Sequence, residues 1–192
     1  VIPARWGQER GLDVASSQAT LAPLFKDVRG TLDWYCLDFW SQKLSLDIPT
    51  IKTGYSEGIR WRPQAETFLR HLNTSHLDVV LITNAHPVTL AMKAERLPLA
   101  QWFNHMVSSH DYGAPKETTR FWDTLMAERP FDPERTLFVD DSEYVLDAAL
   151  AYGVSHLITL RQPDSTLAPR EQTRFPAVHH FEEILQGLPD ID

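Results

Sequence analysis

The chain has 192 residues, of which 43% are hydrophobic, and no apolar run approaches the ~18 residues needed to span a membrane. This composition predicts one buried α/β core with a small accessory region, and it excludes a membrane-spanning or disordered chain. The formal charge of −8 argues against binding to a nucleic-acid polymer, which requires clustered Lys and Arg. Binding of small anionic substrates is compatible with this charge, because a metal ion and a few local hydrogen-bond donors can outweigh the net charge of the protein.

Residues 1–60 have the pattern of helices rich in aromatic side chains, and we expect them to form a helical cap, incomplete at its N-terminus. Thr31 is a candidate N-cap for one helix of this segment. Apolar residues recur in that helix at helical spacing: Leu32, Cys36, Phe39, Trp40 and Leu44. The stretch 47–62 is rich in Pro and Gly and is predicted to be a turn-rich linker to the core.

Residues 61–192 alternate short apolar strands with helices, and we expect them to form the core. The predicted strands cover residues 77–83, 105–108, 136–140 and 155–160, and the predicted helices cover 63–74, 87–96, 117–128, 142–152 and a segment near 179–186. Such alternation predicts right-handed βαβ crossovers and a parallel sheet with helices on both faces, which is a Rossmann-like three-layer α/β fold.

Polar residues follow three of the predicted strands: Thr83 and Asn84, then Lys116, then Asp140 and Asp141. Because ligands bind at the carboxyl ends of strands in open α/β sheets, these side chains are expected to share one crevice. Helix N-termini favour anions, so Thr83 and Asn84 are candidate phosphate ligands. Two adjacent carboxylates repel each other unless a cation is present, and Mg²⁺ is a suitable one.

Each of these residues also has a purely structural alternative. Thr83 is a candidate cap for the helix that starts near Pro87. Lys116 is a candidate solvated surface residue, although a cation at the positive end of a helix is unfavourable without an anion nearby. The two aspartates are compatible with a turn in which Asp141 or Ser142 caps the next helix. The ordered set on successive strand ends is more specific than any one of its members.

The segments Leu81–Asn84, Gly113–Lys116 and Leu137–Ser142 resemble the second, third and fourth motifs of the haloacid dehalogenase-like hydrolases. More narrowly, the segments 31–40, 83–87 and 140–143 resemble a bacterial branch of GMP/IMP nucleotidases. The resemblance implies a Mg²⁺-dependent phosphatase that hydrolyses a small phosphorylated metabolite, in particular a purine nucleoside 5′-monophosphate, through an aspartyl-phosphate. A phosphatase for another metabolite, such as a sugar phosphate, and a truncated non-catalytic relative that binds Mg²⁺ or phosphate are the alternatives.

The same resemblance implies a role for each site residue. Thr83 would orient the phosphoryl group, and Lys116 would neutralise both that group and the nucleophile. Asp141 would coordinate Mg²⁺, with Asp140 as a weaker or indirect ligand. Separately, the aromatic rings of Trp34 and Tyr35 are candidates for stacking on a purine base.

The family's first motif is a strand that ends in Asp-x-Asp, and only one segment of this sequence matches it in part. The segment Asp27–Asp33 contains Gly-Thr-Leu, but Arg29 stands where the acid/base aspartate is required and cannot release a proton. We therefore expect the nucleophile to lie upstream of Val1. In such a fold the missing strand would lie at the centre of the sheet, between the predicted strands 77–83 and 136–140. Without it, two apolar strand edges would be unpaired, and we expect the chain by itself to fold poorly.

The single cysteine, Cys36, cannot form an internal disulfide, and the first residues lack the basic flank and apolar core of a secretion signal. These features predict a cytoplasmic protein without a membrane partner. The sequence gives no indication of the oligomeric state.

Overall fold

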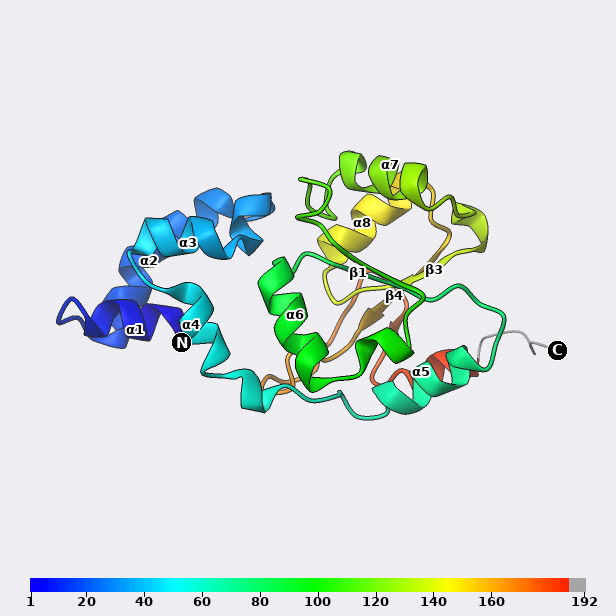
Figure 1. Ribbon diagram of the computed structural model, residues 1–192, viewed down its shortest axis with the longest axis horizontal. Coiled ribbons are helices and arrows are strands. Elements are labelled where there is room, and N and C mark those ends of the chain that lie inside the picture. The colour runs from blue at the N-terminus through cyan, green and yellow to red at the C-terminus, as the bar shows by residue number, and fades with distance from the viewer. Residues whose placement is uncertain (187–192) are drawn as a thin grey trace.

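Parallel strand pairing defines the core of the computed structural model, which describes residues 1–186 (Figure 1). The strands are β1 (Val80–Thr83), β2 (His105–Ser108), β3 (Leu137–Val139), β4 (His156–Leu160) and β5 (Ala177–Val178). Strand β1 pairs with β2, and β3, β4 and β5 pair in that order, every pairing being parallel. The predicted parallel α/β fold is confirmed. Within the described range, none of the helices has both the length and the apolar character to cross a bilayer.

Helices cover both faces of this sheet. They are α5 (Ala65–Asn73), α6 (Pro87–Arg96), α7 (Thr119–Glu128), α8 (Glu143–Tyr152) and α9 (Glu182–Leu185). Side chains of β3 alternate between the faces, as the pleat requires. Phe138 packs in a cluster with residues of α7 and α8, whereas Leu137 and Val139 pack in a second cluster with residues of α5 and α9. The three-layer arrangement follows from this alternation.

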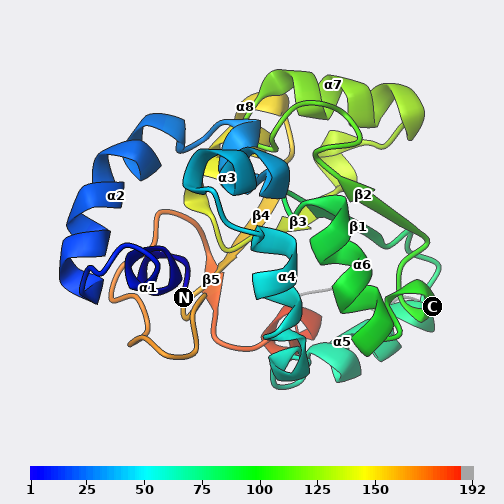
Figure 2. The same ribbon diagram turned by 60° about the vertical axis from the view of Figure 1, so that its left-hand side comes forward.

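The N-terminal helical region consists of α1 (Ile2–Gln8), α2 (Val14–Val28), α3 (Leu37–Leu44) and α4 (Ile48–Thr53). It lies to the left of the core in Figure 1, and in Figure 2, where that side is turned forward, α3 and α4 lie near the centre of the view. It has a hydrophobic cluster of its own, in which Phe25, Trp34 and Trp40 pack edge to face with ring centroids 5.2–6.0 Å apart. The separate cluster supports a domain division near residue 60, which stays a prediction.

The continuous helix predicted after Thr31 is wrong. Residues Leu32–Tyr35 form a 3₁₀ turn, the backbone of Cys36 is extended, and α3 begins only at Leu37, where the Cys36 sulfur accepts the Phe39 N–H at 3.4 Å. The Thr31 side chain makes no cap. The break turns Tyr35 toward the core, where its hydroxyl donates to Glu117 at 2.6 Å, and this tertiary contact outweighs the weak helix propensity of Trp and Tyr.

The turn-rich linker predicted for residues 47–62 is also wrong in part. Helix α4 occupies Ile48–Thr53, and Asp47 caps it by accepting the Thr50 N–H at 3.0 Å. Pro49 lies in the first turn, where its missing N–H costs no hydrogen bond. Residues Ser56–Gly58 form a further 3₁₀ turn before the core begins.

Among the described residues, β1 and β3 each have a hydrogen-bonded neighbour on one side only, as β2 and β5 do at the other ends of the two sheets. The residues of β1 are correspondingly all partly exposed, although three of the four are aliphatic. A central strand of a parallel sheet is normally buried on both faces and paired along both edges. Strands β1 and β3 therefore have the composition of central strands and the pairing of edge strands.

Candidate active site

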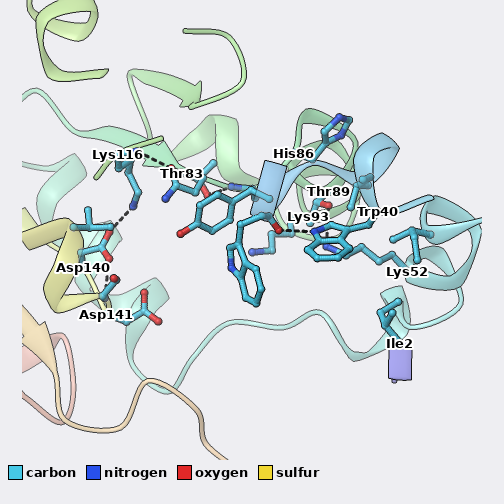
Figure 3. A pocket seen from close by; sticks show the side chains of 18 of the residues that line it. Ile2, Trp40, Lys52, Thr83, His86, Thr89, Lys93, Lys116, Asp140 and Asp141 are labelled. Carbon is cyan, nitrogen blue, oxygen red and sulfur yellow. Dashed lines mark hydrogen bonds and ion pairs between the residues drawn. The ribbon is translucent and has the colours of Figure 1, made fainter. Parts of the chain in front are cut away.

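A cavity of about 530 Å³ lies between the N-terminal helical region and the carboxyl ends of β1 and β3 (Figure 3). All seven residues selected from the sequence line it: Trp34, Tyr35, Thr83, Asn84, Lys116, Asp140 and Asp141. Such a size and such a position at the strand ends are typical of a small-molecule site. The expectation that the polar residues share one crevice is confirmed.

Lys116 and Asp140 form a buried ion pair at one end of this cavity, where Figure 3 shows the two side chains directed at each other. Their exposed fractions are only 7% and 9%. The backbone of Asp140 is held by the sheet, because its N–H donates to the Ile158 carbonyl at 3.1 Å. The second carboxylate oxygen accepts the Ser142 N–H at 2.9 Å. Lys116 is thus not a solvated surface residue, and that alternative is wrong.

The two adjacent aspartates have different environments. Asp140 is buried and neutralised by Lys116, whereas Asp141 is exposed at the cavity wall. The main chain of Asp141 is fixed by Arg170, whose guanidinium donates to the Asp141 carbonyl at 2.9 Å. The Asp141 carboxylate is the member of the pair that is available to a cation.

Thr83 ends β1, and its hydroxyl oxygen accepts the Ala85 N–H at 3.1 Å, which fixes the tight turn between β1 and α6. The hydroxyl proton is left to donate into the cavity. The cap of α6 is His86, whose Nδ1 accepts the Val88 N–H at 3.3 Å. The alternative that Thr83 caps this helix is therefore wrong.

A chain of hydrogen bonds joins Lys116 to the N-terminal helical region. The Lys116 N–H donates to the Asn84 side chain at 2.9 Å, and Asn84 donates to Glu117 at 2.8 Å. The other carboxylate oxygen of Glu117 accepts from the Tyr35 hydroxyl at 2.6 Å. Burial and this hydrogen bond raise the pKa of Tyr35 well above its usual value, so that the phenol stays a neutral donor. Glu117 was not predicted, because nothing in the local sequence shows that it meets Asn84 and Tyr35.

The other end of the cavity carries two lysines, Lys52 of α4 and Lys93 of α6, which lie away from Asp140 and Asp141 in Figure 3. The Lys52 ammonium donates to the Thr89 hydroxyl at 3.4 Å. Burial, and to a lesser degree the charge of Lys93, lowers the pKa of Lys52. The sequence did not indicate this pair, because α4 was predicted to be a linker.

The Asp27–Asp33 segment does not supply the missing first motif. Helix α2 extends to Val28, and Gly30 turns the chain with a φ of +81°. Neither aspartate is among the described residues that line the cavity. The first motif requires an aspartate at the end of a strand that points into the cavity. The Asp27–Asp33 segment follows a helix and therefore does not place a carboxylate there.

Comparison with known proteins provides separate evidence on the family. A family model described as haloacid dehalogenase-like hydrolase matches residues 41–159. Over 188 residues the chain is 35% identical to GMP/IMP nucleotidase YrfG of Escherichia coli (strain K12) and to the protein of that name in Shigella flexneri; each match covers 98% of this chain and 85% of the relative.

The fold is similar to that of a HAD phosphatase from Thermococcus onnurineus, with a TM-score of 0.76 at 14% identity; the match covers 96% of this chain and 85% of that chain. At this identity the likeness supports the fold alone. The family match, the identity to the curated relatives and the polar strand ends point to one conclusion: the chain belongs to the haloacid dehalogenase-like hydrolases.

Proposed function

We propose that the protein is a Mg²⁺-dependent 5′-nucleotidase that removes phosphate from purine nucleoside monophosphates, with GMP and IMP as preferred substrates. The observation that carries this proposal is one cavity with two chemically different ends. Thr83, Lys116 and Asp141 provide donors and a metal ligand at one end, and aromatic rings and two lysines line the rest. The 35% identity to proteins named GMP/IMP nucleotidase supports the same substrate class.

The residues at the phosphate end fit Mg²⁺. The ion prefers oxygen ligands and typically takes one or two carboxylates together with water and substrate phosphate, and Asp141 presents an exposed carboxylate at the cavity wall. Asp140 would act indirectly, because Lys116 and the Ser142 N–H already occupy its two oxygens. When bound, Mg²⁺ would supply positive charge that stabilises the phosphoryl group during transfer.

The side chains around this position have separate tasks in phosphoryl transfer. Thr83 donates its hydroxyl proton to a phosphoryl oxygen and so fixes the orientation of the group. Lys116 supplies a buried positive charge beside the phosphoryl group, and Asp140 holds the ammonium in position. Asn84 fixes the main chain of Lys116. Catalysis of this reaction depends mostly on such positioning and charge stabilisation.

We propose that the nucleophile is on a further parallel strand that pairs between β1 and β3, from a segment outside these 192 residues. The open, apolar edges of both strands support this proposal. A carboxylate at the end of that strand would attack phosphorus and release the nucleoside, with a second aspartate protonating its oxygen. Water would then hydrolyse the aspartyl-phosphate.

The far end of the cavity suits a 6-oxopurine. Trp34 and Tyr35 provide aromatic faces on which a base can stack. Guanine and hypoxanthine both have a carbonyl oxygen at C6, whereas adenine has an amino group there. Lys52 and Lys93 donate hydrogen bonds and cannot accept them, so they favour the carbonyl. The N-terminal helical region, residues 1–60, would thereby act as the cap that selects the substrate.

Phosphate release by the full-length protein tests the proposal, with GMP, IMP, AMP and sugar phosphates compared in Mg²⁺ and in EDTA. We expect kcat/KM for GMP and IMP to exceed that for AMP by about tenfold, which corresponds to one discriminating hydrogen bond. Faster hydrolysis of a sugar phosphate would favour the alternative phosphatase. No hydrolysis of any of these would favour a non-catalytic binding protein. The cytoplasmic location is part of the same proposal.

A further inference from the structure

A second group of potential metal ligands lies beside the cavity, which one of its members lines. It consists of Cys36, His86 and His110, whose ligand atoms all lie within 4.8 Å of one another. The imidazole rings meet edge to face with centroids 4.8 Å apart. A carboxylate oxygen of Asp38 lies 4.0 Å from Nε2 of His86. Three separate segments therefore bring a thiol, two imidazoles and a carboxylate together.

Within this group, His110 has an unusual environment. Among the described residues, neither ring nitrogen of His110 has a hydrogen-bond partner, although both are shielded from solvent. Burying such a group without a partner is unfavourable, so a buried unpaired imidazole calls for an explanation. Burial, and then the neighbouring His86, lowers the pKa of His110. The ring is consequently neutral and has a lone pair to offer a cation.

We propose that Cys36, His86 and His110 bind a transition-metal ion of the Zn²⁺ type, with Asp38 or water as the fourth ligand. Thiolate and imidazole are the ligands of Zn²⁺ in proteins, whereas Mg²⁺ prefers oxygen. A tetrahedral ion with Zn–N bonds of about 2.0 Å and a Zn–S bond of about 2.3 Å requires ligand atoms roughly 3.3–3.6 Å apart. The observed ligand atoms, all within 4.8 Å of one another, would have to move closer together to reach that geometry.

Binding requires two local changes. The Cys36 thiol loses its proton to solvent, and the sulfur keeps lone pairs for the Phe39 N–H that it already accepts at 3.4 Å. Coordination through Nε2 of His86 moves the ring proton to Nδ1, so the weak 3.3 Å bond from the Val88 N–H is given up. The metal–ligand bonds replace that single contact.

This site is distinct from the proposed Mg²⁺ position. Cys36 and His110 do not line the cavity among the described residues, whereas His86 does and is labelled in Figure 3. Cys36 and Asp38 belong to the N-terminal helical region, and His86 and His110 belong to the core. A bound ion would therefore join the two regions beside the cavity.

Titration of the full-length protein with Co²⁺ in saturating Mg²⁺ tests the proposal, because the absorption spectrum of bound Co²⁺ depends on the type and geometry of its ligands. We expect one ion per chain, tetrahedral visible bands and a near-ultraviolet thiolate-to-cobalt band. Cys36→Ser should remove the thiolate band, and His110→Gln should weaken binding at least tenfold, since even indirect ligand partners contribute about 10–100-fold. His179→Gln, at an exposed histidine, is the matched control and should bind as the wild type does.

Alkylation provides a readout that needs no variant. Saturating Zn²⁺ should slow the reaction of iodoacetamide with the peptide that contains Cys36, as followed by mass spectrometry. Binding without the thiolate band, equal affinity in His110→Gln and the control, or unprotected Cys36 would each overturn the proposal. These readouts do not depend on turnover, so they stand whether or not the protein is a nucleotidase.

Discussion

At the scale of single residues, the site separates charges that are adjacent in the sequence. Asp140 and Asp141 differ in exposure and in partners, because β3 carries the first into the interior beside Lys116 and the chain then turns outward. The pair therefore combines a buried, ion-paired carboxylate with an exposed one. Substitutions at the two positions should have different effects on stability and on activity.

Asp141→Asn should leave the fold intact, because the side chain is exposed. In the full-length protein we expect kcat/KM to fall about 100-fold or more, the size of effect seen when one electrostatic contact to a transition state is removed. The Mg²⁺ concentration for half-maximal activity should rise. Steady-state kinetics across a Mg²⁺ series provides the measurement, and kinetics unchanged from the wild type would contradict the metal assignment.

Lys116→Met should reduce stability as well as activity, because it leaves the buried Asp140 carboxylate without its counter-ion. Breaking such a pair typically costs about 3–5 kcal/mol in the free energy of unfolding. Urea denaturation measures the loss, and Lys43→Met, at an exposed position away from the cavity, is the control. Adding Asp140→Leu to Lys116→Met should restore much of the stability without restoring activity. A double variant no more stable than Lys116→Met would show that the unpaired charge is not the cause.

His110 should make stability depend on pH. Its pKa in the folded protein lies below the ordinary 6.5, first because of burial, so the unfolded chain binds the proton more readily. Unfolding free energy should therefore be highest above pH 6.5 and fall as the pH drops from there toward the folded-state pKa. In a metal chelator, the melting temperature of His110→Gln should vary less over this range than that of the wild type. Equal slopes would exclude His110 as the titrating group.

At the scale of elements, the break between Tyr35 and α3 determines how the N-terminal helical region meets the core. Tyr35 reaches Glu117, which also accepts from Asn84, so the N-terminal helical region is linked to the loop that holds Lys116. Each bond in the chain is shorter than 3 Å. The position of one region is thereby coupled to the geometry of the other.

Tyr35→Phe tests this link, because it removes only the hydroxyl and keeps the ring. We expect KM for GMP to change little if the ring alone contacts the base, and kcat to fall several-fold as Glu117 and Asn84 lose a fixed partner. Tyr55→Phe, at an exposed tyrosine, is the matched control. An unaltered kcat would mean that the hydrogen bond has no part in positioning Lys116.

Local patterns predicted much of the fold. Helix α6 and strand β2 have the bounds expected from periodicity, and the polar strand ends converge as parallel topology requires. The parts that were not predicted depend on contacts between distant segments. The break at Cys36, the role of Glu117 and the proximity of Lys52 to Lys93 all arise only when the helical region packs on the core. Strand β5, with two residues, is too short to leave a periodic signal.

At the scale of the whole molecule, the sheet is divided into a two-stranded and a three-stranded part within the described residues. The cavity lies at the carboxyl ends of both parts, so the proposed action of Thr83 and Asp141 on one phosphate requires the two parts to keep a fixed relative position. The helices that cover the sheet hold the two parts together. A strand that paired with both β1 and β3 would hold them more firmly.

Residues 1–192 expressed alone should therefore be less stable than a chain that carries such a strand. We expect a lower urea midpoint and self-association through the open edges, measured by denaturation and by light scattering. A monomer with the same midpoint as the longer chain would contradict the proposed strand. Reading the gene upstream of Val1 for an in-frame segment ending in Asp-x-Asp is the corresponding sequence test.

The open edges of β1 and β3 also make this chain suited to complementation in trans. A synthetic peptide with the sequence of the proposed strand could dock between them, and phosphatase activity would then appear only when both pieces are present. Such a split enzyme would convert peptide binding into a chemical signal. It would also allow the nucleophile to be replaced by unnatural carboxylates without altering the gene for the larger piece.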